Sequence, residues 1–146
     1  MLRAKDLMVG DRVLLFGDKP VKVDCIGNVE VYLSDENGID WRVTYEHIKP
    51  IPLTTEILEK NGFKKAESDF LSQTWAWAEK SEKIYGRWVQ ITFYNKPING
   101  VSYLTKIETC SQKGDGVDHI HSCDIESIHE LQHALRLCGI NLEIKL

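Results

Sequence analysis

The pentapeptide His129-Glu130-Leu131-Gln132-His133 is the stretch whose residue types and spacing indicate chemistry most directly. On a helix, histidines four residues apart lie on one face and can bind the same zinc ion. A glutamate directly after the first histidine is then placed to activate a metal-bound water, as in zinc hydrolases. The pattern therefore offers zinc-dependent hydrolysis as one hypothesis and zinc as the only cofactor indicated.

The apolar residues around this pentapeptide favour an ordinary amphipathic helix over residues 124–138. They recur at helical spacing, as Ile125, Ile128, Leu131, Leu135 and Cys138. His129 and His133 are then expected on the opposite, solvated face, together with Glu126 and Glu130. No third zinc ligand follows at the spacing of a zinc protease, although His47 or His121 could supply one from upstream.

A second group of potential metal ligands surrounds a polar loop expected over residues 111–118. It contains Cys110, His119, His121 and Cys123, a set that would satisfy the four-ligand preference of zinc. Structural zinc sites are usually marked by closer ligand pairs than these. The simpler interpretation is a strand edge with solvated histidines and a thiol in the core.

Aromatic residues mark two expected strands, over residues 73–79 and 87–94. Trp75, Trp77, Trp88 and Tyr94 could line one outer face of a sheet and bind bases, rings or a protein. Tryptophan is mostly buried in proteins, so a wall of the core is the favoured alternative. Because Val89 and Ile91 alternate with Trp88, an exposed Trp88 face would need a closed barrel or a dimer to cover it.

The elements that must position these residues form two segments, 1–50 and 51–146. Strands are expected over 13–16, 21–25, 29–33, 39–45 and 47–49, because turn residues separate short alternating runs. Pro50-Ile51-Pro52 is a stiff connector, and Thr54 begins a helix that ends at Asn61-Gly62. The strand 87–94 turns through 95–100 into 101–109, and the tail 141–146 alternates like a last strand. The fold class is α+β: a small N-terminal β-barrel-like unit, then an antiparallel sheet packed by two helices.

Composition excludes several classes of protein. Of the 146 residues, 42% are hydrophobic and 27% charged, which is typical of globular domains. A net charge of −4 argues against a dominant nucleic-acid-binding surface. We expect no membrane span and no secretory signal. Four cysteines without a CxxC pair then predict a cytoplasmic protein with mostly buried thiols.

Three stretches carry a resemblance to known proteins. The residues ValGlyAspArgVal (9–13) are similar to the opening of SH3-like modules. Residues 51–63 and 128–140 resemble small uncharacterised proteins of gut Bacteroidetes that are often encoded near phage or mobile-element genes. That resemblance implies no assigned activity, and it implies that residues 129–133 belong to an ordinary amphipathic helix.

Three functions follow as hypotheses. The first is a non-enzymatic protein-interaction module of phage or mobile-element origin, acting through the barrel edge or the Trp/Tyr face, with self-association as one alternative. The second is a nucleic-acid-binding accessory protein, in which basic residues of the N-terminal unit gather locally: Lys19, Lys22, Arg42 and Lys49. The third is a zinc protein, structural or hydrolytic, that uses His129 and His133.

Overall fold

The computed structural model describes the chain except for residues 69–71, 79–86, 95–104, 114–115 and 138. The chain forms two compact units. Unit 1 contains Met1–Pro52 and Ser127–His133, and unit 2 contains Leu53–Glu126 and Ala134–Leu146. The units differ from the two continuous segments expected from the sequence, because residues 127–133 belong with the N-terminal strands.

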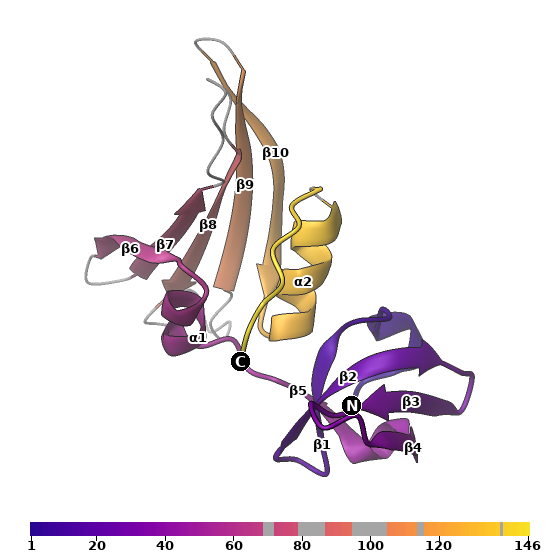
Figure 1. Ribbon diagram of the computed structural model, residues 1–146. Coiled ribbons are helices and arrows are strands. Elements are labelled where there is room, and N and C mark those ends of the chain that lie inside the picture. Colours follow the sequence, from indigo (N-terminus) through magenta and orange to yellow (C-terminus); the bar gives the residue numbers. More distant parts are fainter. Residues whose placement is uncertain (69–71, 79–86, 95–104, 114–115, 138) are drawn as a thin grey trace. The chain divides into compact units, whose positions relative to one another are not determined.

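Unit 1 is built on a five-stranded antiparallel sheet with the order β4-β3-β2-β1-β5 (Figure 1). Consecutive strands pair from β1 to β4, and β5 returns to pair with β1. Short 3-10 helices, η1 (Ala4–Asp6) and η2 (Tyr45–His47), lie before β1 and before β5. The strands are β1 (Arg12–Leu15), β2 (Lys19–Ile26), β3 (Glu30–Ser34), β4 (Asp40–Thr44) and β5 (Ile48–Pro50).

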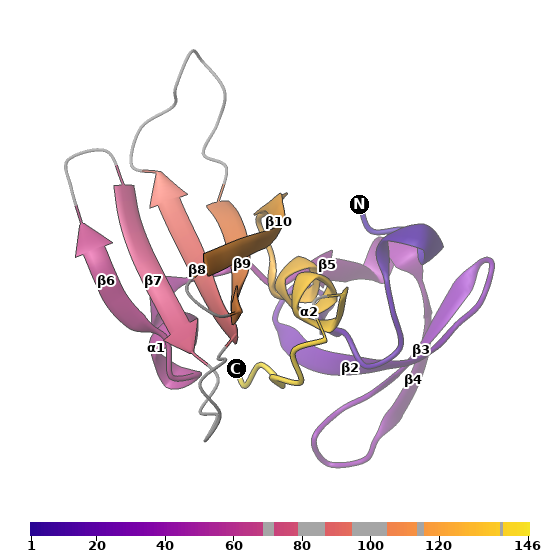
Figure 2. The same cartoon turned by 90° about the horizontal axis from the view of Figure 1, so that it is seen from above.

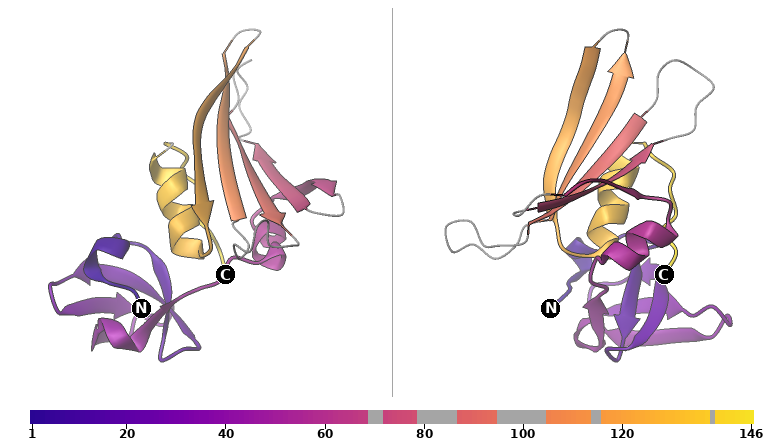
Figure 3. Two further views of the ribbon diagram at one scale, coloured as in Figure 1. Left: turned by 180° about the vertical axis from the view of Figure 1, so that it is seen from behind. Right: turned by 90° about the vertical axis from the view of Figure 1, so that its left-hand side faces the viewer.

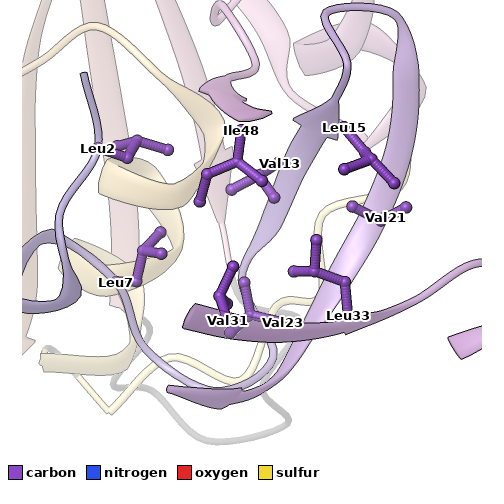
Figure 4. Close-up of a cluster of buried hydrophobic side chains, with 9 residues drawn as sticks. All are labelled: Leu2, Leu7, Val13, Leu15, Val21, Val23, Val31, Leu33 and Ile48. Carbon is purple, nitrogen blue, oxygen red and sulfur yellow. The ribbon is translucent and has the colours of Figure 1, made fainter. Parts of the chain in front are cut away.

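Alternation of apolar and polar residues gives this sheet one buried face. Val13 and Leu15 of β1 are buried, and so are Val21 and Val23 of β2. Leu2 and Leu7 come from the segment around η1 and complete the same cluster (Figure 4). Burial of these side chains is the main source of stability in unit 1, at about 25 cal/mol for each Å² of apolar surface removed from water.

Unit 2 contains a second five-stranded antiparallel sheet, with the order β10-β9-β8-β7-β6. Its strands follow one another along the chain, and Figure 2 shows β6 to β9 side by side. Bulges interrupt the ladder in β6, between Lys65 and Glu67, and in β10, between His119 and His121. The strands are β6 (Lys64–Ser68), β7 (Ser72–Ala78), β8 (Arg87–Tyr94), β9 (Thr105–Lys113) and β10 (Gly116–Ile125).

Helix α1 (Thr55–Lys60) has the end signals expected from the sequence. The Thr54 side chain accepts a hydrogen bond from the Ile57 N–H, and Gly62 ends the helix with a φ of +82°. After α2 the chain runs back to α1 (Figure 3), where the Asn61 side chain bonds both the N–H and the C=O of Lys145. The tail 141–146 is therefore held by α1 and does not form the strand expected from its alternation.

Helix α2 (Ile128–Leu137) begins later than the expected start at residue 124. Asp124 and Ile125 belong to β10, and Ser127 is the residue before the first helical turn. Ile128 and Leu131, which belong to unit 1, are fully buried, and so is Leu135, which belongs to unit 2. The apolar spacing thus correctly predicts the burial of Ile125, Ile128, Leu131 and Leu135 but not the helix boundary, and Cys138 lies outside the described residues.

Three further expectations are corrected by the structure. Within the described residues neither sheet closes into a barrel, so the chain is a mixed protein of two antiparallel sheets and two α-helices. Most of the expected loop 111–118 is strand, because β9 continues to Lys113 and β10 begins at Gly116. The edge strand β6 is an element that the sequence pattern did not indicate. The expected turn 95–100 and residues 101–104 lie outside the described residues.

Candidate binding surface

The glutamate of the 129–133 pentapeptide is occupied by helix capping. Ser127 is the N-cap of α2, because its C=O accepts a hydrogen bond from the Leu131 N–H at 3.1 Å. The Glu130 carboxylate reaches back to accept from the Ser127 N–H at 3.0 Å and from its hydroxyl at 2.8 Å. Residues 127–130 therefore form the S-x-x-E pattern of a capping box, with Glu130 in the position that satisfies the first turn.

His129 is buried, with only 4% of its surface exposed, so the prediction of a solvated face is wrong for this residue. Its Nδ1 lies 2.9 Å from the Ser127 hydroxyl, whose single hydrogen is donated to Glu130. Nδ1 must therefore carry the hydrogen and donate it to Ser127. Burial lowers the pKa of His129, outweighing the opposite effect of the Glu130 and Asp11 carboxylates.

His133 is half-buried and bonded to a carboxylate from the other end of unit 1. Its Nε2 lies 2.7 Å from Oδ2 of Asp11, a side chain with no exposed surface. The same oxygen accepts the Met8 N–H at 2.7 Å. The rings of His129 and His133 meet edge to face, with centroids 5.7 Å apart. His133 thus attaches α2 to the residues before β1, whereas the hydrogen bond of His129 lies within the N-terminal cap of α2.

We expect the E130A substitution to lower the free energy of unfolding by about 1 kcal/mol, the usual cost of losing a helix cap. S127A should have a similar effect, and the double variant should cost less than the sum because both remove the same bonds. Urea denaturation measures all three. An E59A control in α1, where Glu59 is exposed, should change stability by less than about 0.5 kcal/mol. An E130A protein of unchanged stability would contradict the capping role.

Stability should also fall between pH 7.5 and 5.5 because of His129. Its folded pKa lies below the unfolded value of about 6.5, so the unfolded chain takes up the proton first. The contribution of His129 to the free energy of unfolding is complete above the unfolded pKa and is lost as the pH falls below it. The free energy of unfolding then changes by at most about 1.4 kcal/mol per pH unit. Denaturation of H129Q, which keeps a hydrogen-bonding side chain, should show a smaller slope. Equal slopes for both proteins would rule out this cause.

The second ligand set is described only by its backbone. Strand pairing places Cys110 opposite His119, and it places His121 opposite Thr109 and Cys123 opposite Ile107. Among the residues whose side chains the structure describes, no group of three or more His, Cys, Asp or Glu is placed to hold a metal ion. Cys25 is exposed and unpaired, whereas the side chains of the other three cysteines lie outside the described residues, so the expectation of mostly buried thiols stays a prediction.

The proposed Trp/Tyr face is divided by the strand register. Trp75 is buried and pairs with Ile91, and Trp77 pairs with Val89, so these two tryptophans share the face of the apolar core. Trp88 and Tyr94 occupy the alternate positions of β8, opposite Ala78 and Ser72. The favoured alternative, a core wall, therefore describes Trp75, and the four residues do not form one surface.

A different aromatic cluster lies on unit 1. We call Phe16, Trp41 and His47 the aromatic rim. The Phe16 ring packs edge-on against Trp41 at 6.3 Å and against His47 at 5.4 Å between centroids. Phe16 is nevertheless 60% exposed. These residues come from the β1–β2 turn, β4 and η2, so three separate elements bring the rim together.

Phe16 has a strained backbone. Its φ of +53° is the one positive value among the non-glycine residues that the structure describes. Gly17 follows with a φ of +94°, and the Asp18 N–H donates to the Leu15 C=O at 3.4 Å. Two positive φ values are those of a type I′ turn, which favours Asn-Gly and disfavours a bulky first residue. The left-handed conformation costs about 1–2 kcal/mol for such a residue.

Trp41 adds a second unfavourable feature to the rim. Its Nε1 atom is buried and has no hydrogen-bond acceptor among the described residues. The Lys19 ammonium lies over its ring, 4.6 Å from the centroid, and 2.7 Å from the Asp35 carboxylate. The hydrogen bond from Lys19, with that from the Ile39 N–H, lowers the pKa of Asp35. The sequence signal that could reveal the rim is weak, a phenylalanine directly before the turn glycine.

No protein-family model, no curated protein and no solved structure matches this chain. Within the described residues, no helix has the length and apolar character needed to cross a bilayer. Inferences about function therefore depend on the geometry of the chain itself.

Proposed function

We propose that this protein is a non-enzymatic protein-interaction module of the cytoplasm, of phage or mobile-element origin, and that its partner binds the aromatic rim. The observation that carries the proposal is the exposed Phe16 ring on a left-handed backbone. Strain of this kind persists where function maintains it. The Trp41 Nε1, which like that of the core residue Trp75 lacks an acceptor, is a second local cost at the same place.

The surrounding fold is consistent with this role. The order β4-β3-β2-β1-β5 supports an SH3-like arrangement for unit 1, in which loops at one end of the sheet present side chains. Aromatic residues are enriched among the side chains that dominate protein interfaces. The proposed origin depends on the resemblance of residues 51–63 and 128–140 described above.

The ion pairs of unit 1 favour a protein partner over a nucleic acid. Three of the four basic residues considered for phosphate binding are paired with carboxylates: Lys19 with Asp35, Lys22 with Asp24, and Arg42 with Glu30. A cation whose charge is balanced by a neighbouring carboxylate attracts phosphate less strongly than an unpaired cation does. Strong binding to DNA or RNA at low salt that weakens as salt rises would instead support the nucleic-acid alternative.

The test compares proteins captured from a host lysate by the wild-type chain, by F16N and by V29N. Val29 is 70% exposed on unit 1 and serves as a control for loss of an apolar surface residue. We expect F16N to lose a partner that both wild type and V29N retain. Capture of the same proteins by all three chains would contradict a binding role for the rim.

A further inference from the structure

β4 (Asp40–Thr44) is an edge strand with one hydrogen-bonding side unused by its own sheet. Among the strands that the structure describes it pairs with β3 alone, in a register that places Leu33 opposite Trp41. At the turn, the Asp35 N–H donates to the Ile39 C=O. Because bonded pairs alternate along an antiparallel ladder, the backbone groups of Trp41 and Val43 face β3. The backbone groups of Asp40 and Arg42 then face the free edge.

The side chains of β4 are complementary to a second antiparallel copy of the same strand. Asp40 and Arg42 are both exposed and carry opposite charges. Only a two-fold axis at Trp41 places Asp40 of each copy opposite Arg42 of the other. A shift of one pair in either direction sets Asp40 against Asp40 or Arg42 against Arg42, and like charges directly opposite are destabilising.

The same register also pairs the apolar side of the strand with itself. Trp41 would meet Trp41 of the second copy in a non-hydrogen-bonded pair, the type in which side chains approach most closely. Ile39, which is exposed, would lie opposite the half-buried Val43. The exposed Phe16 packs against Trp41, so this pairing would extend the aromatic rim across both copies.

We infer that β4 binds β4 of a second copy of this chain, antiparallel, with Asp40 opposite Arg42. This inference rests on the proposed function, because it names the occupant of the surface that adjoins the aromatic rim. Addition of a strand at an open sheet edge is a general mode of protein recognition, and a two-fold axis makes the interface self-complementary. Arg42 already bonds Glu30 through Nε and Nη2, and its remaining donors can reach a second carboxylate.

Charge reversal tests the inference directly. The D40R substitution places cations opposite each other in a homodimer, and R42D places carboxylates opposite each other. We expect a dimer for the wild type in sedimentation equilibrium and at least about tenfold weaker self-association for each variant, a loss of at least about 1.4 kcal/mol. An equal mixture of the two variants should recover a dimer, because each copy then meets opposite charges. The D40R/R42D double variant should also dimerise.

Controls separate this result from misfolding and from the proposed function. Both side chains are exposed, so each variant should keep the wild-type circular dichroism spectrum and unfold cooperatively. A monomeric wild type at about 100 µM, or a mixture that stays monomeric, would overturn β4 pairing. If the wild type is monomeric but F16N still loses a captured partner, the proposed function stands without the dimer. If all chains dimerise and F16N captures the same proteins as the wild type, the rim has no binding role.

Discussion

Replacing Asp11 by alanine is expected to lower the free energy of unfolding by about 3 kcal/mol, the cost of breaking a buried charged contact. Its carboxylate is fully buried and accepts hydrogen bonds from the Met8 N–H and from Nε2 of His133. The D11A change leaves both donors without this buried acceptor. It also removes the contact that attaches α2 to the residues before β1. Urea denaturation at pH 7 measures the loss.

Two further variants should lower the free energy of unfolding by less than D11A does. H133A should cost less than D11A, because Asp11 keeps its bond to the Met8 N–H. D24A removes an exposed ion pair of 3.7 Å to Lys22 and should cost less than about 0.5 kcal/mol. A D11A protein as stable as D24A would show that the buried carboxylate contributes no net stability.

Local signals explain which parts of the fold could be predicted. Thr54 and Gly62 define α1 because a cap and a positive-φ glycine act within a few residues of the helix they end. The strand at 87–94 was predicted with the bounds of β8, since its apolar and polar residues alternate without interruption. Such elements depend on short-range geometry, which a single sequence contains.

Elements stabilised by long-range pairing were missed. The residues Lys64–Ser68 and Gly116–Asp118 are mostly polar and show no apolar alternation. A loop was therefore expected over 111–118, where β10 begins, and no element was predicted where the structure has β6. They are strands because a neighbouring strand supplies their hydrogen bonds. Polarity along β6 is also expected at a sheet edge, where charged residues prevent unwanted pairing.

The pentapeptide 129–133 shows how one pattern can have two meanings. Its glutamate fits a hydrolase motif, but Ser127 three residues earlier completes a capping box that the sequence also contains. The burial of His129 was not predictable in the same way. The carboxylate that bonds its neighbour His133 comes from Asp11, at the other end of the chain. Helical spacing alone therefore indicated a solvated face.

The aromatic rim was missed for a conformational reason. The turn before β2 was expected at residues 17–20, whereas its two left-handed residues are Phe16 and Gly17. A phenylalanine gives no sequence signal for a positive φ, because its steric preference opposes that conformation. A residue that adopts a backbone conformation against its steric preference is found only when the backbone is known. Such residues are expected at functional sites.

The F16N variant is therefore expected to be about 1 kcal/mol more stable than F16A, although both lose the same ring. Asparagine tolerates the left-handed conformation and gives Asn-Gly, the preferred centre of a type I′ turn. Alanine retains the strain imposed by φ of +53°. Thermal and urea denaturation of the two variants measure the difference, with V29N as a control that leaves this turn unchanged. Equal stabilities would show that no strain is stored at Phe16.

Binding and stability should then respond differently to the two substitutions at this one residue. Relative to F16A, F16N restores turn stability, yet both should bind the captured partner at least about tenfold more weakly than the wild type, as expected for an aromatic hot spot. A residue retained only for folding would show the reverse, with the more stable variant keeping its function. The aromatic side chain at this strained position is therefore best explained by the contact that it makes outside its own unit, which the fold maintains at a cost in stability.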